Sequence, residues 1–571
     1  MSDALLIACV LRLFTLVSAD LGLTGQLFQV SGESGVNNIK LSWGPVASSS
    51  YHVKRGTSSG SYKQIANVTG DTYDDYGLDV GTTYYYMIAT PDAQSNEVSA
   101  TPFAPKGDYE TYDNTKSSDL VIKSKIQDPD GLYYRYIYNE ANGEFAITRE
   151  TSQDGYTFTG NATVLNSTTV CAAINASCHL ERTAFAQHPT TGSVVMWAHL
   201  ENTENYNLAQ VAAAHAPSPG EPFTFDGTYR PLGHDSRDLT FFADDASTNY
   251  TAYILSSTNT NTDMNIYRLT QNWTYVESLA ATVLQAQYRE APAMIKRPDT
   301  GLYYLFTSRA SGWYPSTPNY VYSSSISEGW SEPIVIGNVA TFATQSGGIN
   351  LLGSDANSTT QYEMQSDRWS GNWEPSAPPD RQLFLPISFS TASGSNTAAA
   401  HHHFYRQVAY SDADTLPADQ RAYGIQTGRL LSLGKPASTS PSEGSSNITL
   451  INDGTEDNQA EYFAPASVPF TLEFDLCGDH TISAVDVTVR MVQGSETYYQ
   501  YNITGSEVES GEFTLLADEK NNTDVGFVSS AVSDGGKYRY VRVTIDKVIN
   551  THNGNEADGF AGVHEISIYG S

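Results

Sequence analysis

A short hairpin recurs along the middle of the sequence and leaves few folds open to it. Each copy is a turn followed by a strand in which aromatic and polar residues alternate. The copies follow one another about every 40 to 55 residues, which is typical of a β-propeller because a propeller repeats one small antiparallel sheet around a central axis. The sequence therefore predicts an all-β, five-bladed propeller, whose hairpins span 128–140, 190–202, 247–257, 300–308 and 359–369.

Four polar residues stand at equivalent places in successive hairpin units. Glu181, Asp238, Glu290 and Gln345 each come just before a strongly alternating strand. The innermost strands of a propeller point toward one axis, so we expect these side chains to meet there. Burying several carboxylates around one axis costs several kcal/mol, which favours a functional site for the set. Taken singly, each carboxylate could cap a turn or pair with its neighbouring arginine, which is Arg182, Arg237 or Arg289.

The length and charge of the chain restrict its domain number and its partners. A chain of 571 residues is too long for one core, so three or four domains are expected. The net charge of −32 at pH 7 repels phosphate backbones and disfavours nucleic acid as a partner. No stretch beyond the N-terminal apolar segment is long enough to cross a bilayer, so no membrane partner is expected either.

The N-terminus and the cysteines predict a secreted protein. Residues 4–18 are mostly apolar and end in a small-residue cleavage pattern, which predicts a signal peptide over 1–19. Asn-x-Ser/Thr sequons recur along the chain and fit a glycoprotein. Cys171 and Cys178 bracket a short loop and are expected to form a disulfide, which leaves Cys477 unpaired and buried. The three histidines at 401–403 are expected in a solvated loop.

The N-terminal segment has the strand pattern of a two-sheet sandwich. Residues 21–103 form short alternating strands, with Trp43 early and the run Tyr84 to Tyr86 late. The pattern resembles fibronectin type III modules, which are usually spacers. The resemblance predicts an immunoglobulin-like sandwich over 20–104.

The C-terminal segment, 426–571, also has the strand order of an antiparallel sandwich. It resembles the coagulation factor 5/8 type C, or discoidin-like, fold common in carbohydrate-binding modules. The resemblance implies a structural calcium near the Asp453 turn and Glu565, and oxygen ligands suit that ion. An ordinary turn and a solvated carboxylate are the alternative reading of these two residues.

Between these segments, the motifs HLER, SRDLTFF, EAPAM, YYLFTSRASGWYP and TFATQS occur in this order. They resemble glycoside hydrolase family 43, and within it the exo-β-1,3-galactanases. The resemblance covers about residues 118–400 and predicts a propeller domain over 113–411. It implies a secreted, monomeric enzyme that releases galactose from the non-reducing end of β-1,3-galactan or arabinogalactan of plant cell walls, with inversion and no catalytic cofactor.

The resemblance also implies a role for each candidate residue. Glu290 would be the general acid, and Asp238 would raise its pKa and contact the 2-hydroxyl of the sugar. Gln345 would hold the attacking water in place of the aspartate base found in most of the family. The implied sugar contacts are Glu181, Glu140, Tyr206 and Trp313.

Two other functions stay open at this point. Another family 43 activity, α-L-arabinofuranosidase or β-xylosidase, would need an axial aspartate base. The first unit offers only Asp128 and Asp130, whose DPDG sequence is a hairpin turn at the outer end of a strand. The third possibility is a carbohydrate-binding protein without catalysis, in which the flat faces of Trp313 and Tyr314 stack on a sugar.

Overall fold

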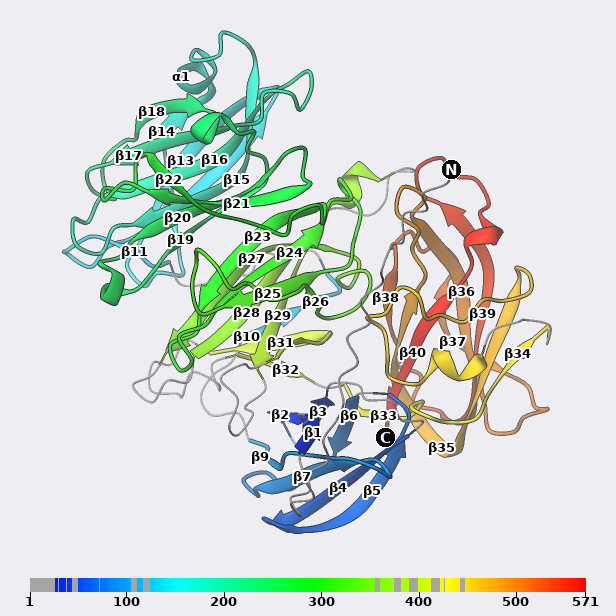
Figure 1. Ribbon diagram of the computed structural model, residues 1–571. Coiled ribbons are helices and arrows are strands. Elements are labelled where there is room, and N and C mark those ends of the chain that lie inside the picture. Colours follow the sequence, from blue (N-terminus) through cyan, green and yellow to red (C-terminus); the bar gives the residue numbers. More distant parts are fainter. Residues whose placement is uncertain are drawn as a thin grey trace, which may run out of the picture.

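The computed structural model is nearly all β-strand (Figure 1), which confirms the predicted fold class at that level. In the described part of the chain the only α-helix is α1 (Ser167–Cys171), and no helix there has the length and hydropathy needed to cross a bilayer. The predicted signal peptide lies outside the described residues. These are 26–28, 30–36, 38–43, 50–70, 72–103, 110–116, 124–354, 360–373, 381–389, 399–411, 422–425, 427–441 and 447–571.

Five four-stranded antiparallel sheets follow one another along the middle of the chain, coloured cyan to yellow-green in Figure 1. The strands of each sheet lie in sequence order, as in a meander. The first three sheets are β11 (Ile126–Gln127), β12 (Tyr133–Ala141), β13 (Glu144–Ser152) and β14 (Thr159–Asn166); β15 (Cys178–Gln187), β16 (Val194–Asn202), β17 (Gln210–Ala216) and β18 (Thr224–Tyr229); and β19 (Leu239–Ala243), β20 (Ala252–Thr258), β21 (Asp263–Leu269) and β22 (Val276–Val283).

The fourth and fifth sheets continue this pattern. Strands β15, β19, β23 and β27 open the second to fifth sheets, and each packs against the next one. The starts of four sheets therefore meet in one region, as radial packing requires. The number of propeller blades stays a prediction. The strands of these two sheets are β23 (Arg289–Lys296), β24 (Tyr303–Arg309), β25 (Asn319–Ser323) and β26 (Ile334–Val335); and β27 (Gln345–Ser354), β28 (Thr360–Arg368), β29 (Arg381–Phe389) and β30 (Ala400–His402).

A three-stranded sheet joins the two ends of this region. It consists of β10 (Glu110–Asp113), β31 (Gln407–Tyr410) and β32 (Ala422–Ile425). Buried Asn114 donates to the carbonyl oxygens of Phe384 (3.1 Å) and Tyr405 (3.0 Å) and accepts from the Phe384 N–H (2.8 Å). The segment before the first sheet is thus tied to strands of the last.

Two sheets share one core in the N-terminal segment, drawn in blue in Figure 1. Trp43 and Tyr86 are buried in that core, as expected of a sandwich. One sheet contains β2 (Val30–Ser34), β3 (Asn38–Trp43) and β6 (Thr72–Tyr76). The other contains β1 (Gln26–Phe28), β8 (Gln94–Ser95), β7 (Tyr84–Ala89), β4 (Tyr51–Ser58), β5 (Ser61–Val68) and β9 (Val98–Ala100).

The C-terminal segment is organised around β35 (Phe470–Val489), which pairs with different strands along its two halves. Its apolar residues lie in one large core. The other strands are β33 (Arg429–Leu430), β34 (Ala437–Ser440), β36 (Thr497–Ser506), β37 (Thr514–Glu519), β38 (Phe527–Ala531), β39 (Lys537–Asn550) and β40 (Val563–Gly570). Short 3-10 helices are η1 (Pro231–Gly233), η2 (Ala246–Thr248), η3 (Ser370–Asn372), η5 (Ile448–Ile451) and η6 (Asp558–Phe560).

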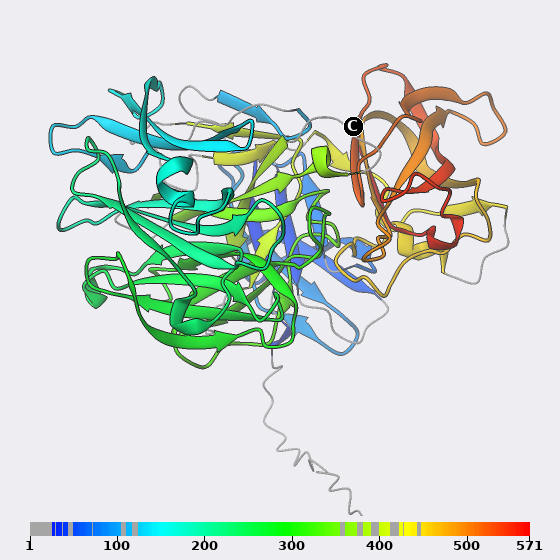
Figure 2. The ribbon, with the colours of Figure 1, turned by 90° about the horizontal axis from the view of Figure 1, so that it is seen from above.

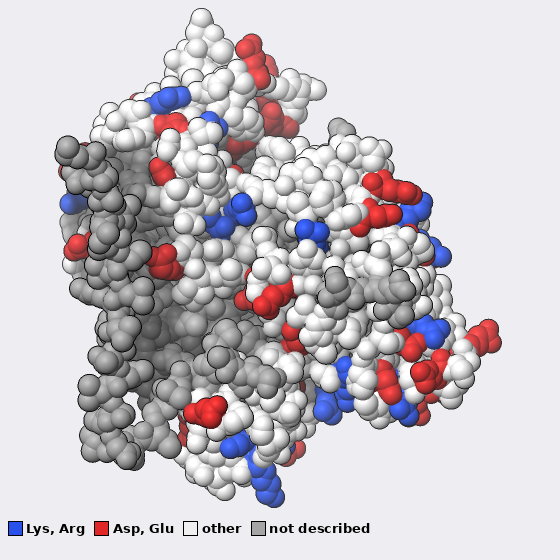
Figure 3. All heavy atoms as spheres, turned by 45° about the vertical axis from the view of Figure 1, so that its right-hand side comes forward, with Lys and Arg blue, Asp and Glu red and all other residues white. Residues whose placement is uncertain are grey.

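The C-terminal sandwich packs on the fourth and fifth sheets, as Figures 1 and 2 agree. One hydrophobic cluster contains Ala340 and Phe342 from the turn before β27 together with Phe527 from β38. A second contains Trp373 together with Tyr498 from β36. On the face shown in Figure 3, acidic and basic side chains are dispersed among other residues.

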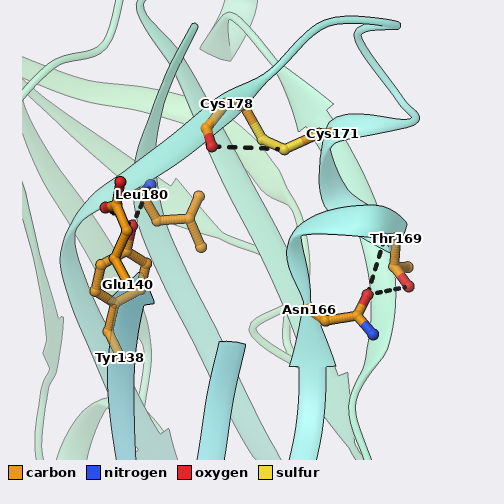
Figure 4. The surroundings of a disulfide bond; sticks show 7 residues. All are labelled: Tyr138, Glu140, Asn166, Thr169, Cys171, Cys178 and Leu180. Carbon is orange, nitrogen blue, oxygen red and sulfur yellow. Dashed lines mark hydrogen bonds between the residues drawn. A yellow bond between two sulfur atoms is a disulfide. The ribbon is translucent and has the colours of Figure 1, made fainter. Parts of the chain in front are cut away.

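The histidines and cysteines correct two predictions. The 401–403 histidines are not in a solvated loop: strand β30 ends at His402, which is 2% exposed. Cys477 is exposed rather than buried, because φ of +62° there interrupts the alternation of β35. Cys171 and Cys178 form a disulfide that ties α1 to β15 (Figure 4).

Candidate active site

Backbone irregularities at the starts of two strands shape the candidate site. In β15 the pairing with β16 shifts register between Glu181 and Ala184, and Arg182 has φ of +50°. In β23 the pairing with β24 shifts between Glu290 and Ala293. Such bulges re-aim side chains that would otherwise alternate between the two faces of a sheet.

Arg182 is the cation at the centre of the site. Its guanidinium donates to Asp238 Oδ2 (3.2 Å), Asp367 Oδ2 (3.1 Å) and Gln345 Oε1 (2.7 Å). Asp238 directly precedes β19 of the third sheet, and Gln345 and Asp367 face each other on β27 and β28 of the fifth. The fork of N–H donors on an arginine suits such a multiple contact. Arg182 does not pair with Glu181 beside it, so the neighbouring ion pair considered from the sequence is wrong here.

Glu290 is a buried carboxyl group, 7% exposed, at the start of β23. Its Oε1 accepts hydrogen bonds from Gln345 Nε2 (2.8 Å) and from the Ser311 N–H (3.2 Å). Burial, together with the negative charge of Asp238, raises its pKa to about 8. Glu290 therefore holds a proton at neutral pH. Its neighbour Arg289 bonds instead to the side chain and carbonyl of Thr307, so that adjacent pair is also wrong.

Gln345, the first residue of β27, links Arg182 to Glu290. Its oxygen accepts from Arg182 and from Trp369 Nε1 (3.0 Å), and its nitrogen donates to Glu290 and to Ser308 Oγ (3.2 Å). Both lone pairs and both hydrogens of the amide are thus engaged. The amide orientation follows from its partners, because Arg182 and Trp369 can only donate.

Glu181 belongs to a second hydrogen-bonded group, in which a histidine lies between two glutamates. It accepts from Tyr206 Oη (2.7 Å) and contacts His199 Nδ1 (3.1 Å), whose Nε2 lies 3.2 Å from fully buried Glu201. Burial opposes the two carboxylate contacts of His199, yet its pKa is raised to about 9. Burial by itself would raise the pKa of Glu181, but the hydrogen bonds from His179 and His199 outweigh burial and lower that pKa. Glu181 is therefore ionised beside an imidazolium.

The remaining predicted sugar contacts lie around this centre. Tyr206 is 43% exposed and Trp313 is 38% exposed, with its ring edge-on to Trp369 at 5.6 Å. Glu140 lies at the end of β12, where its Oε2 accepts from Tyr138 Oη (2.6 Å), and Tyr138 Oη in turn accepts from the Leu180 N–H (Figure 4). Glu140 is thus beside the strand that carries Glu181. In the part of the chain that the structure describes, no hydrogen bond or ion pair joins Glu140 to Glu290.

One group in the described residues has the spacing of metal ligands. Glu181, His199 and Asp238 each offer a ligand atom within 4.8 Å of the other two. Both nitrogens of His199 already face carboxylates, and Arg182 neutralises Asp238. A cation would need a neutral imidazole as a ligand, so these residues do not fit one.

Asp453 and Glu565 lie together in the C-terminal sandwich. Glu565 is 3% exposed, its Oε2 accepts from the Gly454 N–H (3.1 Å), and its Oε1 is buried without a hydrogen-bond partner. Burial raises the pKa of Asp453 to about 6. Burial also raises the pKa of Glu565 well above its ordinary value, and the charge of Asp453 adds to this effect. An orphaned oxygen between unneutralised carboxyl groups fits a calcium ion.

Comparisons with solved structures give the fold alone. The exo-β-1,3-galactanase of Phanerochaete chrysosporium, in a variant crystallised with β-1,3-galactotriose, is 20% identical over 81% of this chain and all of that chain, with a TM-score of 0.50. An exo-β-1,3-galactanase from Clostridium thermocellum is 21% identical over 76% of this chain and 99% of that one, with a TM-score of 0.48. No family model matches the sequence, and no curated protein matches it.

The structure brings together all four residues predicted to meet, and it adds others that the sequence did not single out. Arg182 was considered only as a partner of Glu181, because strict alternation directs it to the opposite face. His199 and Glu201 lie two residues apart on β16 and share a face, which is a signal that could have been used. The other additions are Asn261, Asp367 and Trp369.

Proposed function

We propose that this protein is a secreted glycoside hydrolase that releases galactose from the non-reducing end of β-1,3-galactan with inversion. The observation that carries the proposal is Glu290, a buried carboxyl group that keeps its proton at neutral pH beside the carboxylate of Asp238. A pair of carboxyl groups in different protonation states is the arrangement that glycoside hydrolysis needs. The sequence resemblance and the fold likeness to exo-β-1,3-galactanases support the choice of substrate.

In this proposal Glu290 gives its proton to the departing glycosidic oxygen. Asp238 Oδ2 accepts hydrogen bonds from Arg182 and from the Ala291 N–H at 3.2 Å each. Its negative charge helps to keep the proton on Glu290 until the bond breaks. Once Glu290 has become a carboxylate, the charge of Arg182 nearby stabilises it.

Glu181 and Tyr206 are the proposed contacts to the sugar hydroxyls. An ionised carboxylate accepts strong hydrogen bonds from hydroxyl groups, and His199 holds Glu181 in that state. Tyr206 offers its exposed ring as well as its hydroxyl. Trp313 provides a second exposed aromatic face. Glu140 lies beside β15, the strand that carries Glu181.

Gln345 is proposed to hold the water that attacks the anomeric carbon. Each of its hydrogen-bonding positions is already in use, so it must exchange one bond for the water. Inversion requires about 6.5–9.5 Å between the acid and the group that activates water. We therefore expect the entering sugar to break the hydrogen bond between Gln345 Nε2 and Glu290 Oε1, which is 2.8 Å long.

Separate incubations with β-1,3-galactan, arabinoxylan and arabinan test the proposal. We expect galactose from the first substrate alone, released as the inverted anomer seen by NMR. Release of pentose would instead indicate an arabinofuranosidase or xylosidase. Those activities would need an aspartate base, and the first-unit candidate Asp128 is hydrogen-bonded within the β11–β12 turn. Binding to galactan without any release would indicate a lectin.

The matched variant is Glu290→Gln. We expect it to lose at least about 1,000-fold in kcat while it keeps its fold and its affinity for galactan. Near-normal turnover in this variant would remove Glu290 from the acid role.

We also propose that Asp453 and Glu565 hold a structural calcium ion. A cation bound only by the folded state stabilises it by mass action. We expect a chelator to lower Tm by several degrees and added calcium to restore it, while Asp453→Asn should show neither response. An unchanged Tm in the chelated wild-type protein would contradict the site.

A further inference from the structure

The hydrogen bonds around Glu290 determine which of its oxygens carries the proton. Oε1 accepts from the backbone N–H of Ser311, which can only donate. It also accepts from Gln345 Nε2, and the amide of Gln345 cannot turn over because Arg182 and Trp369 both donate to its oxygen. With two fixed donors on Oε1, the proton of the neutral acid must lie on Oε2.

Asn261 is the residue that faces Oε2. Its amide nitrogen lies 3.2 Å from that oxygen, and its own oxygen is buried without a hydrogen-bond partner. An N–H pointing at Oε2 suits an ionised carboxylate, whereas a protonated Oε2 presents a hydrogen of its own. A half-turn of the amide exchanges its two ends, which have nearly the same shape, and places the orphaned oxygen where it can accept that hydrogen.

The loop that carries Asn261 is held in a costly backbone conformation. Asn259, Thr260 and Asn261 have φ of +53°, +57° and +62°, and residues other than glycine rarely adopt such values. Asp235 restrains the loop by accepting from the N–H groups of Asn259 (2.6 Å) and Thr260 (2.9 Å). Consecutive strained residues cost free energy and are found mainly where a side chain must be held for function.

We propose that Asn261 is a positioning residue whose side-chain oxygen accepts a hydrogen bond from the O–H of protonated Glu290 and keeps that hydrogen in place until the substrate takes the proton. The inference rests on the proposed role of Glu290 as the proton donor. Asn261 does not react itself. Its oxygen stabilises the neutral acid, and the charged groups that also act on Glu290 are Asp238, Arg182 and Arg289.

The test follows the proton of Glu290 directly. The infrared C=O band of a protonated carboxylic acid, taken as the difference between the wild type and Glu290→Gln, reports this group without any turnover. Asn261→Gly keeps a residue that tolerates positive φ and removes only the side chain. We expect the midpoint, which is the pH at which half of this band has disappeared, to fall by about one pH unit in Asn261→Gly, because the neutral acid loses its hydrogen-bond acceptor. The alkaline limit of kcat should move down with it.

Thr260→Gly is the matched control, since it makes the same backbone change one residue earlier and should leave the midpoint in place. A midpoint that rises in Asn261→Gly would overturn the proposal, because the amide would then serve the ionised form through its N–H. An unchanged midpoint would overturn it too. The infrared result stands even if galactan proves not to be the substrate, so the two proposals fail separately.

Discussion

Arg182 shows how a single residue combines the charges of the site. It donates to Asp238, Asp367 and Gln345, and so joins its own strand β15 to the third and fifth sheets. The contact with the Gln345 oxygen fixes the orientation of that amide. The sequence identified Asp238 and Gln345 at these places, but neither Asp367 nor the role of the cation between them. For Glu181 and Glu290, pairing with the neighbouring arginine was the alternative, and the other partners that Arg182 and Arg289 bind decide against it.

Glu290→Gln should change the pH dependence of stability as well as activity. The pKa of Glu290 is raised from about 4.5 to about 8 in the folded state. Its contribution to stability is therefore fully present below pH 4.5 and is lost as the pH rises toward 8. Glutamine carries no charge, so we expect the variant to exceed the wild type by about 1–3 kcal/mol at pH 8 and by little at pH 4. Chemical denaturation at both pH values measures this difference. An equal difference at the two values would contradict the raised pKa.

Substitution of Gln345 tests its role in holding water. We expect Gln345→Ala to lower kcat at least about 100-fold with a much smaller change in KM, because water positioning acts in the transition state. Azide needs no activation and should partly restore turnover by forming the galactosyl azide. A variant that azide does not rescue would point to Gln345 as a structural tie between Arg182 and Glu290.

At the scale of elements, the repeated hairpins predicted the sheets but not their irregular ends. Period-two alternation located the strands from β12 to β28 and the turns before them, because it reflects one buried and one less buried face. Bulges leave no comparable mark in a sequence. The bulged starts of β15 and β23 therefore had to come from the structure, and so did the side chains that these bulges redirect.

The bulge in β27 offers a test with its own control. Register shifts between Ser346 and Gly348, and a Cβ added at Gly347 would lie 2.4 Å from Asp367 Oδ2 and 3.3 Å from Arg182 Nη1. We expect Gly347→Ala to displace these groups and to lower kcat/KM about 10- to 100-fold. A Cβ at Gly348 meets no atom within 4 Å, so Gly348→Ala should leave kcat/KM within about twofold. Equal losses of kcat/KM in the two variants would show that the backbone of the bulge matters rather than the contact with Asp367 and Arg182.

At the scale of the whole molecule, the C-terminal sandwich touches the segment that supports the acid. Gln493 Nε2 donates to the Ala310 carbonyl (2.9 Å), and the ring of His552 lies 4.2 Å from that of Tyr314. Ser311, between them, donates its N–H to Glu290. Sequence patterns describe each unit by itself, so contacts between units could not be predicted from them.

Removing one of these contacts should weaken catalysis from a distance. We expect Gln493→Ala to lower kcat about two- to tenfold, because a freer 310–314 segment holds Glu290 less firmly. Lys547, exposed on β39 of the same sandwich, is the matched control, and Lys547→Ala should not change kcat. Steady-state kinetics on β-1,3-galactan makes the comparison. Identical kcat values for both variants and the wild type would show that the sandwich does not influence the acid.

The shared packing of Phe527 with Ala340 and Phe342 also bears on how this chain can be shortened. A fragment ending after β32 would leave those two side chains facing water, and exposed apolar patches promote self-association. Leu433 packs against the N-terminal core in the same way. Truncated versions are therefore expected to be poorly soluble, and tags or fusion partners belong at the chain ends rather than at the seams between units.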